Sequence, residues 1–105
     1  PGLDDDTLSQ ALAEVVGTMG RNAEMQGADL IGHIKAVLKT PGGGYLFASV
    51  TGFGREPSVR GRLPRRADQG TLTINAIVYG IDRDRLAAIG QDAVAQFADT
   101  LARKH

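Results

Sequence analysis

Residues 30–51, LIGHIKAVLKTPGGGYLFASVT, carry the pattern that decides the fold. Apolar and polar side chains alternate along residues 29–39 and again along 45–51, as they do in strands that bury one face. The segment between them, Thr40-Pro41-Gly42-Gly43-Gly44, is typical of a hairpin turn. The stretch therefore predicts two neighbouring antiparallel strands. The aliphatic side of this hairpin is predicted to consist of Leu30, Gly32, Ile34, Ala36, Leu38, Leu46, Ala48 and Val50.

Two more strands are expected after the hairpin. Residues 71–81 alternate clearly, and one side of that strand is aliphatic from Leu72 to Val78. Residues 52–70 are irregular, but a structureless loop of that length is unusual in a compact domain. We therefore predict a short strand over residues 58–63, in which Arg60 and Arg62 point outward.

A helix is predicted at each end of the chain, over residues 7–25 and 83–103. Thr7 and Gln10 fit a capping box that starts the first helix, and Asp82 is a suitable N-cap for the second. The order is α-β-β-(β)-β-α. We predict a single α+β domain over residues 1–105, in which an antiparallel meander of three or four strands carries both helices on one face. The apolar stripes of the two helices are Leu8, Leu12, Val15, Val16 and Met19, and Leu86, Ile89, Ala93, Val94, Phe97 and Leu101.

Composition excludes several classes of chemistry. The 105 residues contain twelve Lys or Arg and twelve Asp or Glu, so the formal net charge is zero. The absence of cysteine excludes disulfides, thiolate nucleophiles and cysteine-bearing zinc or iron–sulfur sites. It also suits the reducing environment of a cytoplasmic protein. No stretch approaches the roughly 18 consecutive apolar residues of a membrane-spanning helix, so no membrane partner is expected.

The two helices cover one face of the predicted sheet and leave the other face open. Ile31, Val37 and Ile77 make that face more apolar than solvation alone requires, and Phe53 is expected on or beside it. Exposed apolar patches mark interfaces, although a solvated face is the simpler alternative. We therefore expect a non-catalytic binding or assembly module, or an accessory domain of a larger protein, that forms a homo-oligomer or docks on a protein partner through this face. The candidate binding residues are His33, Lys35, Tyr45, Phe47, Ser49, Asn75 and Tyr79.

A cluster of arginines supports a second hypothesis. Arginine is the preferred partner of phosphate groups, and aromatic rings stack on nucleobases. The cluster, with Tyr45 and Phe47, therefore predicts binding of an anion or of RNA; the alternative is a solvated basic loop. The candidate anion-binding residues are Arg55, Arg60, Arg62, Arg65 and Arg66.

A third hypothesis is a small enzyme that uses His33 as an acid or base. No carboxylate is predicted on the face of His33, so no triad and no catalytic residue are assigned. His33 and His105 are the only imidazoles, so no metal site is expected. The glycines at 42–44 join two strands instead of opening a helix, which does not match a phosphate loop, and no cofactor is expected.

Two regions resemble the C-terminal domain of CobW-like P-loop GTPases. The first is residues 27–35, GADLIGHIK, where a helix end runs into a strand with a His-x-Lys pattern. The second combines the strand GTLTINA at 70–76 with the helix start DRDRL at 82–86. The chain lacks the P-loop and the cysteine metal motif of that family. The resemblance implies an accessory domain without the GTPase engine, and no catalytic residue carries over.

Overall fold

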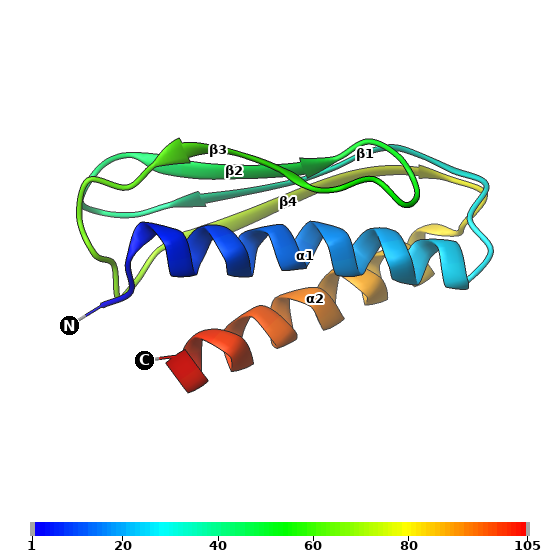
Figure 1. The fold of residues 1–105 in the computed structure, drawn as a ribbon. Helices are drawn as coiled ribbons and strands as arrows, with labels where there is room; N and C mark the ends of the chain where they lie inside the picture. The colour runs from blue at the N-terminus through cyan, green and yellow to red at the C-terminus, as the bar shows by residue number, and fades with distance from the viewer. Residues whose placement is uncertain (1, 105) are drawn as a thin grey trace.

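The computed structural model describes residues 2–104. Both helices lie on one face of a single four-stranded antiparallel sheet, and the other face is open (Figure 1). The predicted α+β class, the short strand near residues 58–63 and the one-sided helix layer are thereby confirmed. The elements are α1 (Asp5–Met25), β1 (Leu30–Lys39), β2 (Tyr45–Val50), β3 (Ser58–Arg62), β4 (Thr71–Tyr79) and α2 (Arg83–Lys104).

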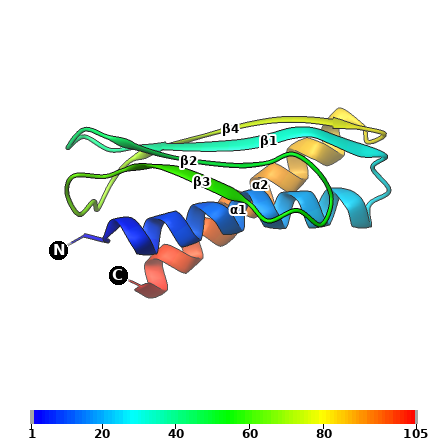
Figure 2. The same ribbon diagram turned by 45° about the horizontal axis from the view of Figure 1, so that its top comes forward.

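The sheet has the strand order β3-β2-β1-β4, so the chain crosses from one edge of the sheet to the other between β3 and β4. The first three strands form the predicted meander, and β4 then returns to the far side of β1, as in a Greek key. The returning segment passes the start of α1, where Leu3 and Ala67 exchange two backbone hydrogen bonds of 2.8 and 2.9 Å. Figure 2 shows this connection beside the N-terminal end of α1.

The first helix begins at Asp5, two residues before the predicted range of 7–25. The backbone N–H of Thr7 donates to Oδ1 of Asp4 at 2.9 Å, so Asp4 is the N-cap and Thr7 lies inside the first turn. Asp5 and Asp6 then occupy the positive end of the helix dipole. At the start of the second helix, the N–H of Arg85 donates to Oδ1 of Asp82 at 2.8 Å, which confirms the predicted cap.

The core lies between α1 and the middle of the sheet. The apolar stripe of α1 packs directly on β1 and β2, so the central side chains of this layer have no exposed surface. They are Leu12, Val16, Ile34, Ala36 and Leu46. Gly17 and Gly20 do not end the helix. A Cβ on Gly20 would lie 3.4 Å from a methyl group of Ile31, so glycine permits a close approach between helix and sheet.

The alternation predicted for β1 is correct from His33 to Lys39 and wrong at Leu30 and Ile31. The pairing of β1 with β4 shifts between Ile31 and His33, which makes a bulge at Gly32. The extra residue reverses the two faces, so Ile31 is buried in the core and Leu30 is half exposed. A Cβ on Gly32 would lie only 3.1 Å from the side chain of Ile77, so the bulge brings β1 and β4 into close contact.

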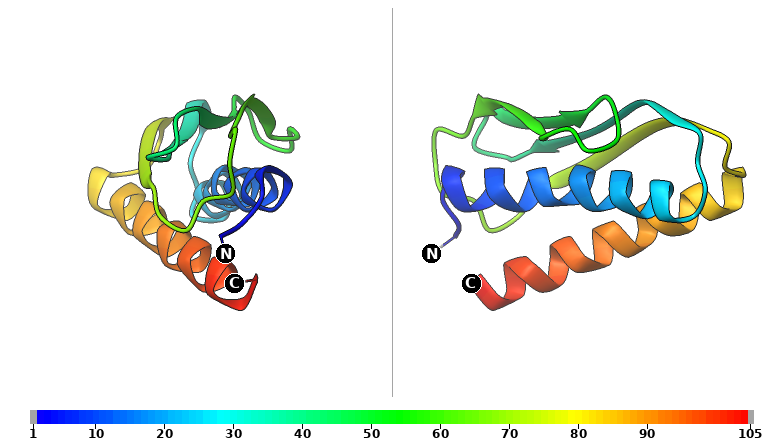
Figure 3. Two further views of the ribbon diagram at one scale, coloured as in Figure 1. Left: turned by 90° about the vertical axis from the view of Figure 1, so that its left-hand side faces the viewer. Right: turned by 45° about the vertical axis from the view of Figure 1, so that its right-hand side comes forward.

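The second helix packs on α1 and diverges from the sheet toward its C-terminus (Figure 3). Ile89, Ala93 and Phe97 are its buried residues. The inward side chains of β4, which include Ile74 and Ala76, are only partly buried. Neither helix in residues 2–104 has the long apolar run that crossing a bilayer requires.

Candidate functional site

The open face of the sheet is built from side chains that alternate with the core residues of each strand. Residues directly opposite each other on antiparallel strands point to the same side. The pairing therefore aligns the face in rows that run across the strands from β3 to β4. From the hairpin end, the first three rows are Arg62, Tyr45, Lys39 and Thr71; Arg60, Phe47, Val37 and Thr73; and Ser58, Ser49, Lys35 and Asn75.

Two arginine–aromatic pairs occupy one side of this face. Arg62 lies opposite Tyr45 and Arg60 lies opposite Phe47, each at the spacing of direct cross-strand neighbours. The ring of Tyr45 is half exposed and that of Phe47 is half buried. Since Tyr45 and Phe47 are two residues apart on the same strand, their rings stand side by side along β2.

All charged side chains of the strands are basic. Apart from His33 and the tyrosines, the ionisable side chains of β1 to β4 are those of Lys35, Lys39, Arg60 and Arg62. All four are exposed. Within residues 2–104, none of the four is in an ion pair. The twelve carboxylates lie on the helices and the connections instead. A chain of zero net charge thus presents a positive sheet face on one side, and on the other side an acidic α1 beside an α2 that carries charges of both signs.

Two contacts place β3, and with it Arg60 and Arg62. Gly61 has φ of +98°, and a Cβ there would clash with the carbonyl oxygen of Tyr45, so only glycine fits between the two arginines. One residue beyond β3, the N–H of Leu63 donates to Oδ2 of Asp5 at 2.7 Å. This charge-assisted bond ties the end of β3 to the first turn of α1.

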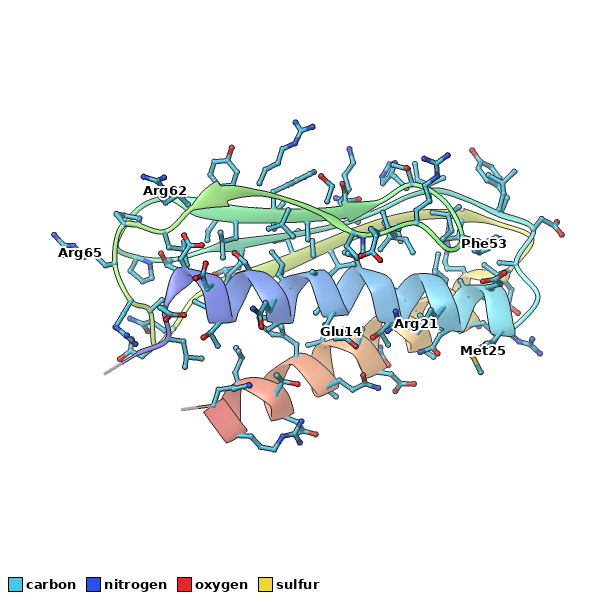
Figure 4. All side chains as sticks on the ribbon, in the orientation of Figure 1. Glu14, Arg21, Met25, Phe53, Arg62 and Arg65 are labelled. Atoms are coloured by element: carbon cyan, nitrogen blue, oxygen red, sulfur yellow. The ribbon has the colours of Figure 1, made fainter. Side chains whose placement is uncertain are left out.

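The structure separates the predicted arginine cluster into four locations. Arg60 and Arg62 lie on the open face, whereas Arg55 lies in the connection between β2 and β3. Arg65 lies beyond Arg62 on the connection to β4 (Figure 4) and packs over Gly42. Arg66 turns to the N-terminus, where it donates to the carbonyl of Gly2 at 3.3 Å and lies 4.0 Å from Asp4.

Some other residues predicted on the open face lie there, and two do not. Those that follow the predicted alternation are His33, Ser49, Asn75 and Tyr79, and the side chain of Tyr79 is 55% exposed. Ile31 is a core residue because of the bulge. The placement of Phe53 on or beside the open face is wrong, because Phe53 lies on the helix side and packs against the core (Figure 4).

Lys39 belongs to the face as fully as Lys35 does, although it was absent from the candidate set. The alternation of β1 already placed Lys39 on the same side as Lys35. Its position beside Tyr45 depends on the register of the hairpin.

The surroundings of His33 do not resemble an active site. His33 is half buried and lies opposite Ile77, while Ser49 pairs with Lys35 and not with His33. Within the described residues, no carboxylate forms an ion pair with His33, and His33 lines none of five hollows on their surface. Nor do residues 2–104 gather three His, Asp or Glu side chains as a metal site would require, and His105 lies outside the described residues.

Comparison with known proteins gives no relative: no family model, no curated protein and no solved structure matches the chain. The resemblance to the CobW-like C-terminal domain therefore stays a prediction.

Proposed function

We propose that the open face binds single-stranded nucleic acid. The observation that carries the proposal is the pairing of Arg60 with Phe47 and of Arg62 with Tyr45 on a face that has no carboxylate. Aromatic rings stack on bases whatever their sequence, and neighbouring cations neutralise the phosphates. An extended strand laid along β2 would meet rings in the middle and cations on both sides, from β3 and β1.

The shape of the face favours an extended polymer over a small molecule. Small-molecule sites are concave, whereas the arginine–aromatic pairs line none of five hollows on the surface of residues 2–104. Docking of two copies face to face is the less favourable alternative, because it would bring two sets of four cations together.

The test is fluorescence anisotropy with a labelled, mixed-sequence, single-stranded RNA over a range of salt concentrations. We compare R60A/R62A with R85A/R103A, which removes the same charge from the exposed surface of α2. If each arginine neutralises one phosphate, R60A/R62A reduces the slope of log K against log salt by about 1.4, at about 0.7 per phosphate. The control R85A/R103A leaves that slope close to the wild-type value.

Replacement of an aromatic ring separates stacking from charge. We expect Y45A to weaken RNA binding by about five- to a hundredfold, the range for losing one stacked base, without changing the salt slope. Tyr45 is 51% exposed, so the substitution leaves the core intact. Equal binding by wild type and R60A/R62A, or no binding of wild type at low salt, would contradict the proposal.

A further inference from the structure

The two edges of the sheet differ sharply in how they are protected. The edge strand β3 has five residues, two of them arginine, and Gly61 in a left-handed conformation. Short length, charge and irregular backbone are the usual means of preventing an edge from pairing with another strand. The edge strand β4 has none of them. It runs for nine residues, TLTINAIVY, without a charge, a proline or a positive φ angle.

Next to this unprotected edge lies an apolar groove between β4 and α2. Its volume is about 560 Å³, and its lining includes Ile74 and Ala76 of β4 and Leu86, Gly90 and Val94 of α2. Val94 is 43% exposed. By contrast, Ile34 and Ala36, their neighbours on β1, are fully buried. We call this side of the molecule the β4 flank. It consists of the unpaired backbone groups of the edge strand β4 and of the partly exposed aliphatic side chains in the groove between β4 and α2.

We propose that this flank binds a second copy of the chain through antiparallel β4–β4 pairing about a two-fold axis at Asn75. In that register the sequence of β4 complements itself. On the core side, Leu72 meets Val78 and Ile74 meets Ala76 of the second copy, so every pair is aliphatic. On the open side, Thr73 meets Ile77 of the second copy, and no pair brings like charges together.

The size of the flank suits a dimer. A nine-residue strand spans about 30 Å, and with the helix layer beneath it the contact patch is roughly 30 by 20 Å, or about 600 Å² per copy. Both copies together would bury about 1,200 Å², which is the lower end of the range for specific interfaces. The two-fold axis also brings the two grooves together, so the aliphatic side chains that one copy leaves open would be covered by the other copy.

The two-fold axis of an antiparallel strand pair is perpendicular to the sheet. The dimer would therefore have one continuous sheet of eight strands, with all helices on one side and both open faces on the other. This inference does not depend on nucleic-acid binding, because the arginine–aromatic pairs lie at the opposite edge from β4.

The test is sedimentation equilibrium with two matched double variants. T73K/I77K places lysine opposite lysine twice in the dimer, whereas T73K/I77E places lysine opposite glutamate. Both positions are exposed in the single chain, so both variants should fold, and circular dichroism checks this. We expect wild type to approach twice the 11.1 kDa mass of the chain. We expect the dimer dissociation constant of T73K/I77K to be at least about tenfold above that of T73K/I77E.

Two results would overturn the inference. The first is a wild-type protein that stays monomeric at high micromolar concentration. The second is an equal dissociation constant for the two double variants. That result would mean that residue 73 of one copy does not lie opposite residue 77 of the other. Failure of RNA binding in the earlier experiment would leave both of these measurements unaffected.

Discussion

The side chain of Asp4 shows how one residue fixes where an element begins. Its carboxylate accepts the N–H of Thr7 at 2.9 Å, and the guanidinium of Arg66 lies 4.0 Å away. The hydrogen bonds from Thr7, and to a smaller extent the charge of Arg66, lower the pKa of Asp4 below its ordinary value of 3.8. The folded chain therefore holds the ionised form of Asp4 more tightly than the unfolded chain does.

This shift predicts a specific loss of stability in acid. Because the folded pKa is the lower one, the contribution of Asp4 is fully present well above pH 3.8 and disappears as the pH falls through the folded value. D4N keeps a capping oxygen but has no charge to lose. In urea denaturation, wild type should be more stable than D4N near neutral pH, and the difference should shrink toward zero in strong acid.

The same series with D6N is the control. The side chain of Asp6 makes no hydrogen bond or ion pair within residues 2–104, so the difference between wild type and D6N should change less with pH. A difference between wild type and D4N that stays constant over the acid range would contradict the assignment of Asp4 as an ionised cap.

The cap of α1 also marks a limit of prediction from sequence. Thr7 and Gln10 fit a capping box, but three aspartates precede them and each can cap a helix as well. The choice depends on where the incoming chain is held. That position is set by the bridge between Leu3 and Ala67, a contact between segments far apart in sequence. Local pattern contains no information about such a contact.

At the scale of the element, β1 shows where alternation succeeds and where it fails. From His33 to Lys39 every residue faces the predicted side, because an uninterrupted strand has a period of two. The bulge at Gly32 inserts one residue and reverses Leu30 and Ile31. A glycine within a strand can mark a bulge or only a close contact, so the pattern alone did not predict the reversal.

Gly61 governs the position of β3, and its replacement gives a test at this scale. G61A combines the cost of a positive φ, about 1–2 kcal/mol, with a clash against the backbone of Tyr45. G43A is the matched control, because Gly43 has φ of +88° and no atom lies within 4 Å of its Cβ position. We expect urea denaturation to show a larger loss of stability for G61A than for G43A.

The two variants should also differ in RNA binding. Displacement of β3 moves Arg60 and Arg62 away from the rings of Phe47 and Tyr45, so G61A should weaken binding while G43A does not. Equal stability of the two variants would contradict the view that β3 is held by the close contact of Gly61 with β2.

At the scale of the molecule, the separation of charge emerges only when the strands are assembled. The sequence predicted an open face with Lys35, Tyr45 and Phe47, and a basic segment farther along the chain. It also predicted that Arg60 and Arg62 join this face through the short strand at residues 58–63. It did not predict the register that pairs Arg62 with Tyr45 and Arg60 with Phe47, or that Arg55, Arg65 and Arg66 lie elsewhere. Register across β2 and β3 is a long-range property, and the strand order β3-β2-β1-β4 is another. Both depend on pairing energies that no single segment contains.

This separation predicts that the protein behaves as a cation toward a flat, negatively charged surface although its net charge is zero. A sulfonate resin at neutral pH can contact the sheet face directly, whereas the carboxylates of the helix layer lie on the opposite side of the molecule and are farther from the resin. Wild type should therefore be retained on the resin.

R60A/R62A and R85A/R103A distinguish local charge from total charge, because each variant lowers the net charge by the same two units. If retention followed net charge, both variants would elute at the same salt concentration. We expect R60A/R62A to elute clearly earlier, because it halves the four cations of the open face, whereas R85A/R103A should elute close to wild type. Coincident elution of the two variants would show that the sheet face does not act as a positive surface, and would remove the electrostatic basis for nucleic-acid binding there.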